Sequence, residues 1–315
     1  MGPLLFGGGP FLCPMFGPTA FTHAQRVRRF SLALILVGAG LSLGLGQWLP
    51  EWQWPLAAFL IGTVGIQHGA LDHILHAHMH GDPEGPLRQS FALPYIAGIG
   101  GAWAAFEWAP SVMLGLFLLA SAYHFGMSHL RVDMSRNKVS AKGENALAGT
   151  LIGLALIAPL VLRPDALDVL SGFGWNIQLH GRAQWQPLQV ATGCAAFLTL
   201  VLHREIKSGW LPLSGVFLAW VVPDLLLAFA LYFVLGHARE AFWDEFKNRQ
   251  SLDVRFWRLY RRSLPLSIAF AGMAGVVFWL TNTNVLSERA ALSFLLAGTL
   301  PHIAVIEGWV TARTR

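Results

Sequence analysis

Three polar side chains interrupt an apolar stretch of this chain at a spacing that suits metal chemistry. His68, Asp72 and His76 follow one another at intervals of four residues, so on one α-helix they would share a face. A polar ring inside a long apolar run is costly to bury and is usually functional. An imidazole and a carboxylate one turn apart could be two metal ligands, or a ligand and the residue that orients it. A hydrogen-bonded core histidine followed by a solvated, histidine-rich helix end explains the same pattern.

Three further histidines, His124, His237 and His302, fall inside other apolar stretches. In the topology described below, these residues and His68 lie toward the inner ends of four different membrane spans. Histidines placed at random would not gather in one leaflet of the membrane, whereas the histidines of a single site must lie at a similar depth. Imidazole-rich sites with few carboxylates suit iron, zinc or copper rather than magnesium or calcium. The joint pattern therefore indicates a metal site more strongly than any one histidine does.

Each of these histidines also has a structural explanation of its own. His124 could be a core histidine bonded to a neighbouring carbonyl group, and His237 could be an interfacial residue beside charged neighbours. His302 follows Pro301 and could fill the hydrogen-bonding gap that a proline leaves at a helix kink. Solvated helix ends or a loose surface metal patch are expected at His76, His78, His80 and His129. Loop or interface positions are expected at His23, His180 and His203.

Small and aromatic residues adjoin the buried histidines. Small residues permit close helix approach, or leave room for a ligand between helices. Aromatic neighbours such as Phe125 and Phe233 fit a long apolar substrate, although aromatic side chains are also ordinary at lipid-facing positions. The small residues in question are Gly65, Gly69, Ala70, Gly126, Gly236 and Gly298.

The composition of the chain places these residues in a membrane protein. Of 315 residues, 54% are hydrophobic and 12% are charged, and the mean hydropathy is +0.51. A soluble globular domain carries roughly 25% charged residues. The net charge of +5 is scattered over short connecting segments, which argues against a nucleic-acid partner. Cys13 and Cys194 lie far apart without metal-ligand spacing, so neither a disulfide framework nor a thiolate site is expected.

The apolar runs predict an all-α, polytopic helical bundle with about eight to ten transmembrane helices. We expect a disordered basic tail at 1–29, a transmembrane domain at 30–310 and a short tail at 311–315. Residues 210–238 read either as one tilted helix or as two short spans broken at Pro223-Asp224. The predicted spans are 30–50, 53–76, 90–107, 109–130, 145–163, 186–203, 210–222, 223–238, 263–280 and 290–310.

The positive charges orient the bundle. Segment 239–262 carries seven Lys/Arg residues, and only a break at Pro223-Asp224 puts it on the same side as the basic amino end. A re-entrant hairpin over 210–238 would give the same sidedness. We therefore expect a multi-pass protein of the inner (plasma) membrane with both termini cytoplasmic. The outside segment 164–185 is long enough for a short surface helix.

Four motifs occur in the order seen in the Brp/Blh family, and the chain resembles that family over nearly its whole length after residue 30. Brp/Blh proteins are bacterial and archaeal membrane β-carotene 15,15′-dioxygenases that make retinal for rhodopsins. The resemblance implies a multi-span helical oxygenase that uses O2 to cleave the central double bond of β-carotene into two all-trans retinals. It also implies a functional link to a retinal-binding rhodopsin. The motifs are His68-Gly-Ala-Leu-Asp-His73, Tyr123-His-Phe-Gly126, Tyr232-Phe-x-x-x-His237 and Thr299-x-Pro-His302.

The resemblance implies non-haem Fe(II) bound by histidines. Carried over residue by residue, the iron ligands would be His68, His124 and His237. Asp72 would orient a ligand, and His302 would be a fourth ligand or support the others. Three imidazoles can hold iron and leave open positions for oxygen.

One motif departs from the family pattern. After its first histidine the family usually reads Ser-x-Arg-His, whereas this chain reads His237-Ala-Arg-Glu-Ala241, so the second histidine is absent. His302, Glu240 or Asp72 could complete the coordination sphere. The departure leaves a divergent member as an alternative, acting on another apolar polyene or without oxygenase activity.

Two hypotheses come from other functional classes. Asp72 and Asp224 could take part in the intramembrane His/Asp relay of a transporter, although the candidates crowd one leaflet rather than form a path across the membrane. Alternatively, His68 and His124 could face each other across a haem. The amount and kind of bound metal distinguishes these hypotheses from a non-haem iron enzyme.

Overall fold

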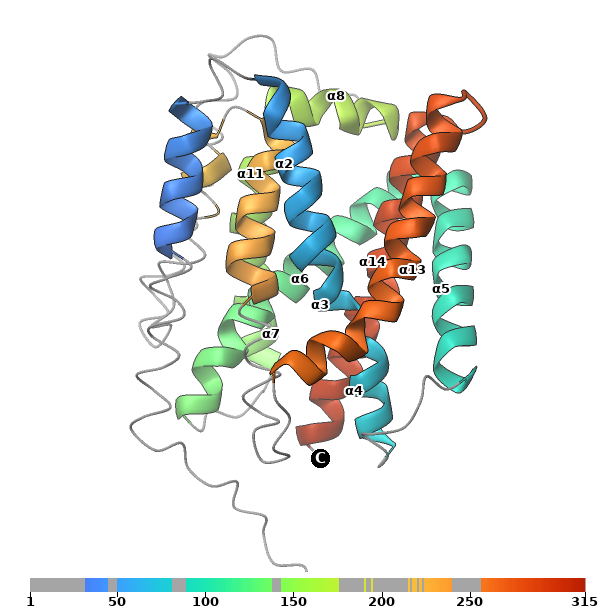
Figure 1. Ribbon diagram of the computed structural model, residues 1–315. Helices are drawn as coiled ribbons and strands as arrows, with labels where there is room; N and C mark the ends of the chain where they lie inside the picture. The colour runs from blue at the N-terminus through green and yellow to red at the C-terminus, as the bar shows by residue number, and fades with distance from the viewer. Residues whose placement is uncertain are drawn as a thin grey trace, which may run out of the picture.

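The computed structural model is a bundle of helices (Figure 1). Among the residues that the structure describes there is no strand, which confirms the predicted all-α class. The predicted tail at 1–29 and nearly all of the predicted span over 186–203 lie outside the described residues. The structure describes residues 32–44, 50–80, 89–137, 143–175, 224–239 and 256–314, together with 190, 194, 215, 217–219 and 221–222.

Within the part of the chain that the structure describes, three helices are long and apolar enough to cross a membrane, which agrees with the predicted membrane bundle. A fourth candidate is a pair of helices bent by 98°, α7 (Gly143–Val161) and α8 (Pro164–Gly172). The short α8 confirms the helix expected after residue 163. The three long helices are α6 (Pro110–Asn137), α13 (Phe256–Asn282) and α14 (Glu288–Thr314).

The helices surround a central region where α3, α6 and α14 come together (Figure 1). The helix α5 (Gln89–Trp108) packs against α14, and α13 runs along the same side. On the other side α11 packs against α2, with the apolar helix Leu32–Gly44 beyond it. The helix α8 lies across one end of the bundle.

The predicted span over 53–76 is wrong as one continuous helix. The chain forms α2 (Gln53–Leu60), the π-helical turn η2 (Ile61–Gly65) and α3 (Ile66–Gly69), and then a turn at Ala70-Leu71. A new helix, α4 (Asp72–Met79), starts at the aspartate, because an acidic side chain is favoured in the first turn of a helix. The short turn η1 (Pro50–Trp52) precedes α2.

A second break falls at Pro223-Asp224, as one of the two sequence readings predicted. Helical residues before it end at Val221, and α11 (Leu225–Leu231) starts after Asp224, whose Oδ1 accepts a hydrogen bond of 2.7 Å from the Leu227 amide. This carboxylate satisfies a backbone donor that a helix start leaves open. The chain continues as a second π-helical segment, η3 (Tyr232–Ala238).

Arg163 holds the carbonyl end of the helix before this break. Its Nη1 donates to the carbonyl oxygens of Ala219 at 3.1 Å and Val222 at 2.7 Å, while Nε and Nη2 pair with Asp165 at 2.9 Å. The last carbonyls of a helix have no partner within the helix, and a cation is favoured beside them. The Arg163 side chain thus ties the α7–α8 corner to the segment that precedes α11.

Glycines bring α6 and α7 into backbone contact. A Cβ on Gly126 would overlap the carbonyl oxygen of Gly149, and a Cβ on Gly153 would overlap that of Ala122. Small residues spaced by four on two membrane helices permit this close approach. Of the two roles that the sequence left open for Gly126, the structure therefore supports helix packing rather than space for a ligand.

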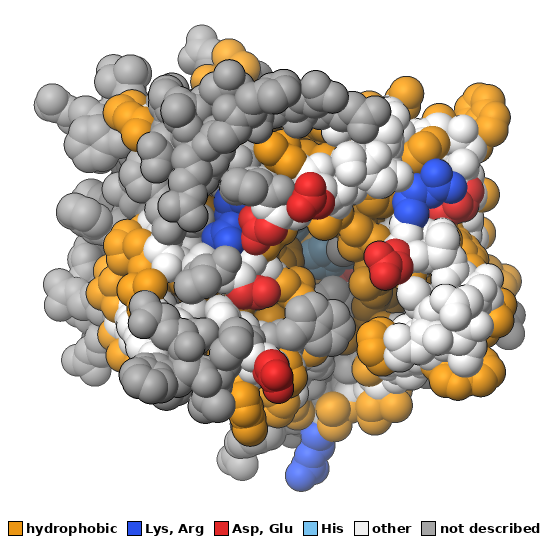
Figure 2. Space-filling model, turned by 90° about the horizontal axis from the view of Figure 1, so that it is seen from above, with side chains coloured by type: hydrophobic (Ala, Val, Ile, Leu, Met, Phe, Trp, Pro, Cys, Tyr) orange, Lys and Arg blue, Asp and Glu red, His pale blue; other side chains and the backbone are white. Residues whose placement is uncertain are grey.

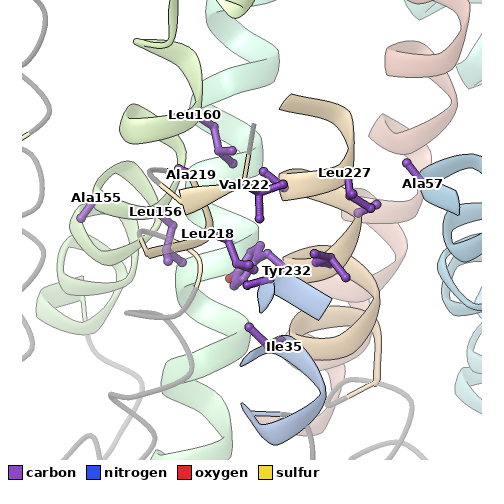
Figure 3. Packing of buried hydrophobic residues seen from close by; sticks show 14 of the residues in the cluster. Ile35, Ala57, Ala155, Leu156, Leu160, Leu218, Ala219, Val222, Leu227 and Tyr232 are labelled. Atoms are coloured by element: carbon purple, nitrogen blue, oxygen red, sulfur yellow. The ribbon is translucent and has the colours of Figure 1, made fainter. Parts of the chain in front are cut away.

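The largest apolar cluster holds the helices beside this contact together (Figure 3). It joins six segments of the chain, and Tyr232 of η3 belongs to it. In a bilayer such packing acts through van der Waals contact, since lipid tails are as apolar as the side chains. The cluster thereby fixes α11 and η3 against α2. One buried member from each segment is Ile35, Ala57, Met127, Leu156, Leu218 and Leu227.

Candidate metal centre

Four imidazoles from four different helical segments meet inside the bundle: His68 of α3, His124 of α6, His237 of η3 and His302 of α14. Their ring centroids form a closed cycle of edge-to-face neighbours. His68 lies 5.1 Å from His237 and 4.6 Å from His302, and His124 lies 5.1 Å from His237 and 5.4 Å from His302. All four residues are buried, with exposed fractions between 1% and 8%. The structure therefore brings together all four histidines that the sequence singled out.

Ring nitrogens in this cluster lie at distances that suit a bound metal ion. Potential ligand nitrogens of His68, His124 and His237 all lie within 4.8 Å of one another. Within the described part of the chain, neither buried ring nitrogen of His237 has a hydrogen-bond partner. Leaving a buried polar group unpaired costs about 1–3 kcal/mol. A metal ion that accepts a nitrogen lone pair would remove that cost, so the residues fit such an ion.

His302 is held by a carboxylate on one side and faces another imidazole on the other. Its Nδ1 lies 2.9 Å and 3.1 Å from the two carboxylate oxygens of Asp72, and its Nε2 lies 3.1 Å from Nε2 of His68. A neutral imidazole that donates from Nδ1 has its lone pair on Nε2, the atom left for a metal. Two ligand atoms that bind one ion with bonds of about 2.1 Å, at a right angle to each other, lie roughly 3 Å apart. The Nε2 atoms of His302 and His68 lie at such a distance.

These contacts correct one expectation from the sequence. His302 could have filled the hydrogen-bonding gap behind Pro301, but both of its ring nitrogens point to other helices. The proline lies inside α14, and the imidazole joins that helix to α3 and α4 instead.

Asp72 reaches the cluster by a different route from the one that its spacing predicted. The expected common face of His68, Asp72 and His76 does not exist, because the helix breaks at Ala70-Leu71. The carboxylate contacts His302, and it also accepts a 2.9 Å hydrogen bond from the Tyr95 hydroxyl. His76 stays outside the cluster, where its ring lies beside those of His80 and Phe91.

Two π-helical segments lie next to each other at the site. η2 precedes His68 and η3 carries His237, and a Cβ on Gly65 would lie 2.7 Å from Cε1 of Phe233. π-helical turns are rare and often occur at functional sites, because they change the direction of the side chains that follow. Here both wide turns adjoin a histidine of the cluster.

Sequence reasoning placed one histidine wrongly. His129 was expected to be a solvated helix end, but it is fully buried, and its Nε2 lies 2.7 Å from the Tyr232 hydroxyl. This contact joins α6 to η3, five residues beyond His124 and five residues before His237. His237 is itself buried rather than interfacial, which removes the structural alternative considered for it.

Two further residues at the site were not selected from the sequence. Tyr95 is an ordinary aromatic residue of an apolar run, and nothing local sets it apart. Glu307 lies in the last candidate span, where a carboxylate is rare enough to be a functional signal. Its Oε1 lies 3.8 Å from Nδ1 of His124.

Aromatic side chains lie against one histidine of the cluster, and the cluster lies below a hollow in the molecular surface. Figure 2, seen from the α8 end, shows a histidine surface at the bottom of this hollow, with hydrophobic side chains beside it and several Asp and Glu side chains around its mouth. The ring of Phe125 meets that of His237 edge to face at 4.5 Å, and Phe233 stacks on His237 at 5.8 Å. The arrangement can hold a metal ion in a largely apolar setting that is reached from one end.

The structure argues against the transporter and haem hypotheses at the residues on which each depends. Asp224 caps α11, so it serves the backbone rather than a transport relay. A haem between His68 and His124 would need a flat space between their two rings. The rings of His237 and His302 fill that space, because each of them contacts both His68 and His124.

Comparison with known proteins points in one direction. A family model described as beta-carotene 15,15′-dioxygenase matches residues 59–310, a range that contains the whole cluster. The beta-carotene 15,15′-dioxygenase of the uncultured marine bacterium 66A03 is 25% identical over 276 residues, which cover 84% of this chain and 95% of that protein. No solved structure matches the chain.

Proposed function

Because this chain belongs to the β-carotene 15,15′-dioxygenase family, we propose that it uses O2 to cleave β-carotene at the central 15,15′ double bond into two retinals. The observation that carries the proposal is the meeting of four buried imidazoles from four helical segments within the range that matches the family. The chain is thus a carotenoid-cleaving dioxygenase of the membrane, and the exact bond and product are the part to be tested.

The metal ion in this proposal is Fe(II), held by His68, His124 and His237. His302 would serve as a fourth ligand or would support the other three, and as a ligand it would compensate for the histidine that is absent at Ala241. Neutral imidazoles suit ferrous iron, and the unpaired ring nitrogens of His237 support the assignment. When bound, iron supplies the redox chemistry that lets O2 react with an alkene.

The protein's own residues would hold and align the reactants. Asp72 accepts from Nδ1 of His302 and keeps its Nε2 turned toward the other ligands, while Tyr95 keeps the carboxylate in place. We expect a polyene dissolved in the bilayer to reach the cluster between the helices, where apolar side chains would keep water away. Phe125 and Phe233 back the His237 ring and limit where the polyene can lie. Selection of one double bond then becomes a matter of positioning.

The cellular setting follows from the reaction and the topology. We expect the protein in the inner (plasma) membrane with both termini in the cytoplasm, and its product implies a retinal-binding rhodopsin as the consumer. The lipid bilayer itself delivers the carotenoid substrate.

A test uses a bacterial host that makes β-carotene. Wild type should bleach the cells and produce retinal, measured by chromatography of the extracted pigments. His124→Ala should abolish retinal at equal protein level. The matched control is His80→Ala, which removes an exposed histidine outside the cluster and should retain full activity.

The outcomes separate the alternatives. Well-expressed wild type that contains iron but leaves β-carotene intact would overturn the substrate and favour another polyene. Protein without stoichiometric iron would overturn the metal assignment. Longer or shorter aldehydes in place of retinal would overturn the position of cleavage.

A further inference from the structure

Glu307 is a second carboxylate at the imidazole cluster, and the proposed roles above do not use it. It follows His302 on α14 by five residues, so one helix supplies both side chains. Its Oε1 is buried and faces Nδ1 of His124 at 3.8 Å, although the side chain as a whole is 24% exposed. This geometry differs from that of a solvated acid at a helix end, such as the exposed Glu288 on the same helix.

The cluster then has the same pattern on both sides. Asp72 lies against His302, and Glu307 lies against His124. In each pair the carboxylate approaches Nδ1, so Nε2 is the ring nitrogen that remains available to a metal ion. A carboxylate behind a ligating histidine fixes the orientation of its ring and raises its basicity. At 3.8 Å the Glu307 contact is too long for a direct hydrogen bond, so the carboxylate would act on His124 through its charge.

In the apolar interior of a membrane, two carboxylates beside the ligands would balance the charge of a bound divalent cation. Neutral imidazoles leave the two positive charges of a divalent cation uncompensated, and an isolated charge is costly in an apolar medium. Two carboxylates beside the ligands supply two negative charges. With the ion bound, the site as a whole carries no net charge.

We infer that Glu307 is a positioning residue of the metal site, orienting His124 and supplying, with Asp72, the negative charge that matches a divalent cation. The inference rests on the proposed metal site. It predicts that Glu307 matters to the loaded protein and not to the empty one.

The experiment titrates the full chain, purified in detergent and freed of metal, with Co²⁺ and follows the visible absorption of the bound ion. Glu307→Gln should weaken Co²⁺ binding by about 10- to 100-fold, the usual effect of losing a carboxylate behind a ligand. It should also change the absorption spectrum. Glu307→Asp, which keeps the charge, should recover part of the affinity. Glu288→Gln makes the same charge change on the same helix and should bind like wild type.

Thermal unfolding with and without Co²⁺ distinguishes this role from a purely structural one. Metal-free Glu307→Gln should unfold close to the wild-type temperature, since the proposed role of the carboxylate requires the bound cation. Its gain in unfolding temperature on adding Co²⁺ should be smaller than that of wild type.

Three results would overturn the inference. The first is a Glu307→Gln variant that matches wild type in affinity and spectrum. The second is a Glu307→Gln variant that lowers the unfolding temperature of the metal-free protein. The third result is wild type that binds no Co²⁺. That result would overturn the metal site itself, and it is distinct from a wild type that binds metal but cleaves no carotene.

Discussion

Nδ1 of His302 lies 2.9 Å from Oδ1 of Asp72, although 230 residues separate the two in the sequence. The pair joins the first turn of α4 to the middle of α14, and the Tyr95 hydroxyl of α5 completes it from a third helix. A buried carboxylate with two donors is well satisfied. The arrangement therefore gives His302 one orientation, with Nε2 toward His68.

Asp72→Asn should weaken metal binding while leaving the bundle folded. The amide oxygen can still accept from His302, but the negative charge is gone. We expect affinity for a divalent ion to fall about 10- to 100-fold, with a parallel loss of activity at limiting iron. Metal titration of purified protein measures the effect. Tyr95→Phe keeps the carboxylate and should lose less, so an equal loss in both variants would contradict the role given to the charge.

Gly126→Ala should destabilise the protein, because the added methyl group overlaps the Gly149 carbonyl oxygen. Overpacking of this kind costs about 1–3 kcal/mol. Gly272→Ala is the matched control, since a Cβ there meets nothing within 4 Å. In thermal unfolding experiments in detergent, the unfolding midpoint should fall for Gly126→Ala and stay unchanged for Gly272→Ala. Equal midpoints would mean that α6 and α7 are not packed at these glycines.

Tyr232→Phe should lower stability by removing the hydroxyl that His129 contacts at 2.7 Å. A buried polar group that loses its partner costs about 1–3 kcal/mol. Adding His129→Leu to the same chain should restore part of that loss, since both polar partners are then absent. A double-mutant cycle of unfolding midpoints measures the coupling. Strictly additive effects would contradict a direct interaction across α6 and η3.

Arg163→Lys should be more harmful than the same change at a surface arginine. Lysine cannot reproduce the fork that binds two carbonyl oxygens and both oxygens of Asp165 at once. The expected cost is about 1–3 kcal/mol, because helix-end carbonyls lose a buried donor. Arg289→Lys, which pairs with Glu107 at the surface, should change stability by less than about 1 kcal/mol. A similar shift in the unfolding midpoint for both variants would show that the contacts of Arg163 stabilise the protein no more than a surface ion pair does.

Several structural features could be predicted from sequence because their signals are local. Apolar runs indicated the helices, and Pro223-Asp224 marked a real break, since proline and an N-cap aspartate act on adjacent backbone. The break at Ala70-Leu71 contains no proline, and the aspartate that follows it also suited the face of one continuous helix. It was missed, and the expected common face of His68 and Asp72 was wrong for that reason. His129 was misjudged because it stands near a helix end in sequence, while its burial depends on η3 packing over it.

The sequence by itself determined that this chain is an all-helical membrane protein and which imidazoles would be costly to bury. Hydropathy and the burial cost of a polar ring are properties of short segments, so they can be read without knowing any partner. Only the tertiary structure decided that His302 takes Asp72, that His124 faces Glu307 and that Gly126 serves packing. Those pairings depend on how helices break, cross and approach one another, and the distances that settle them join residues far apart along the chain.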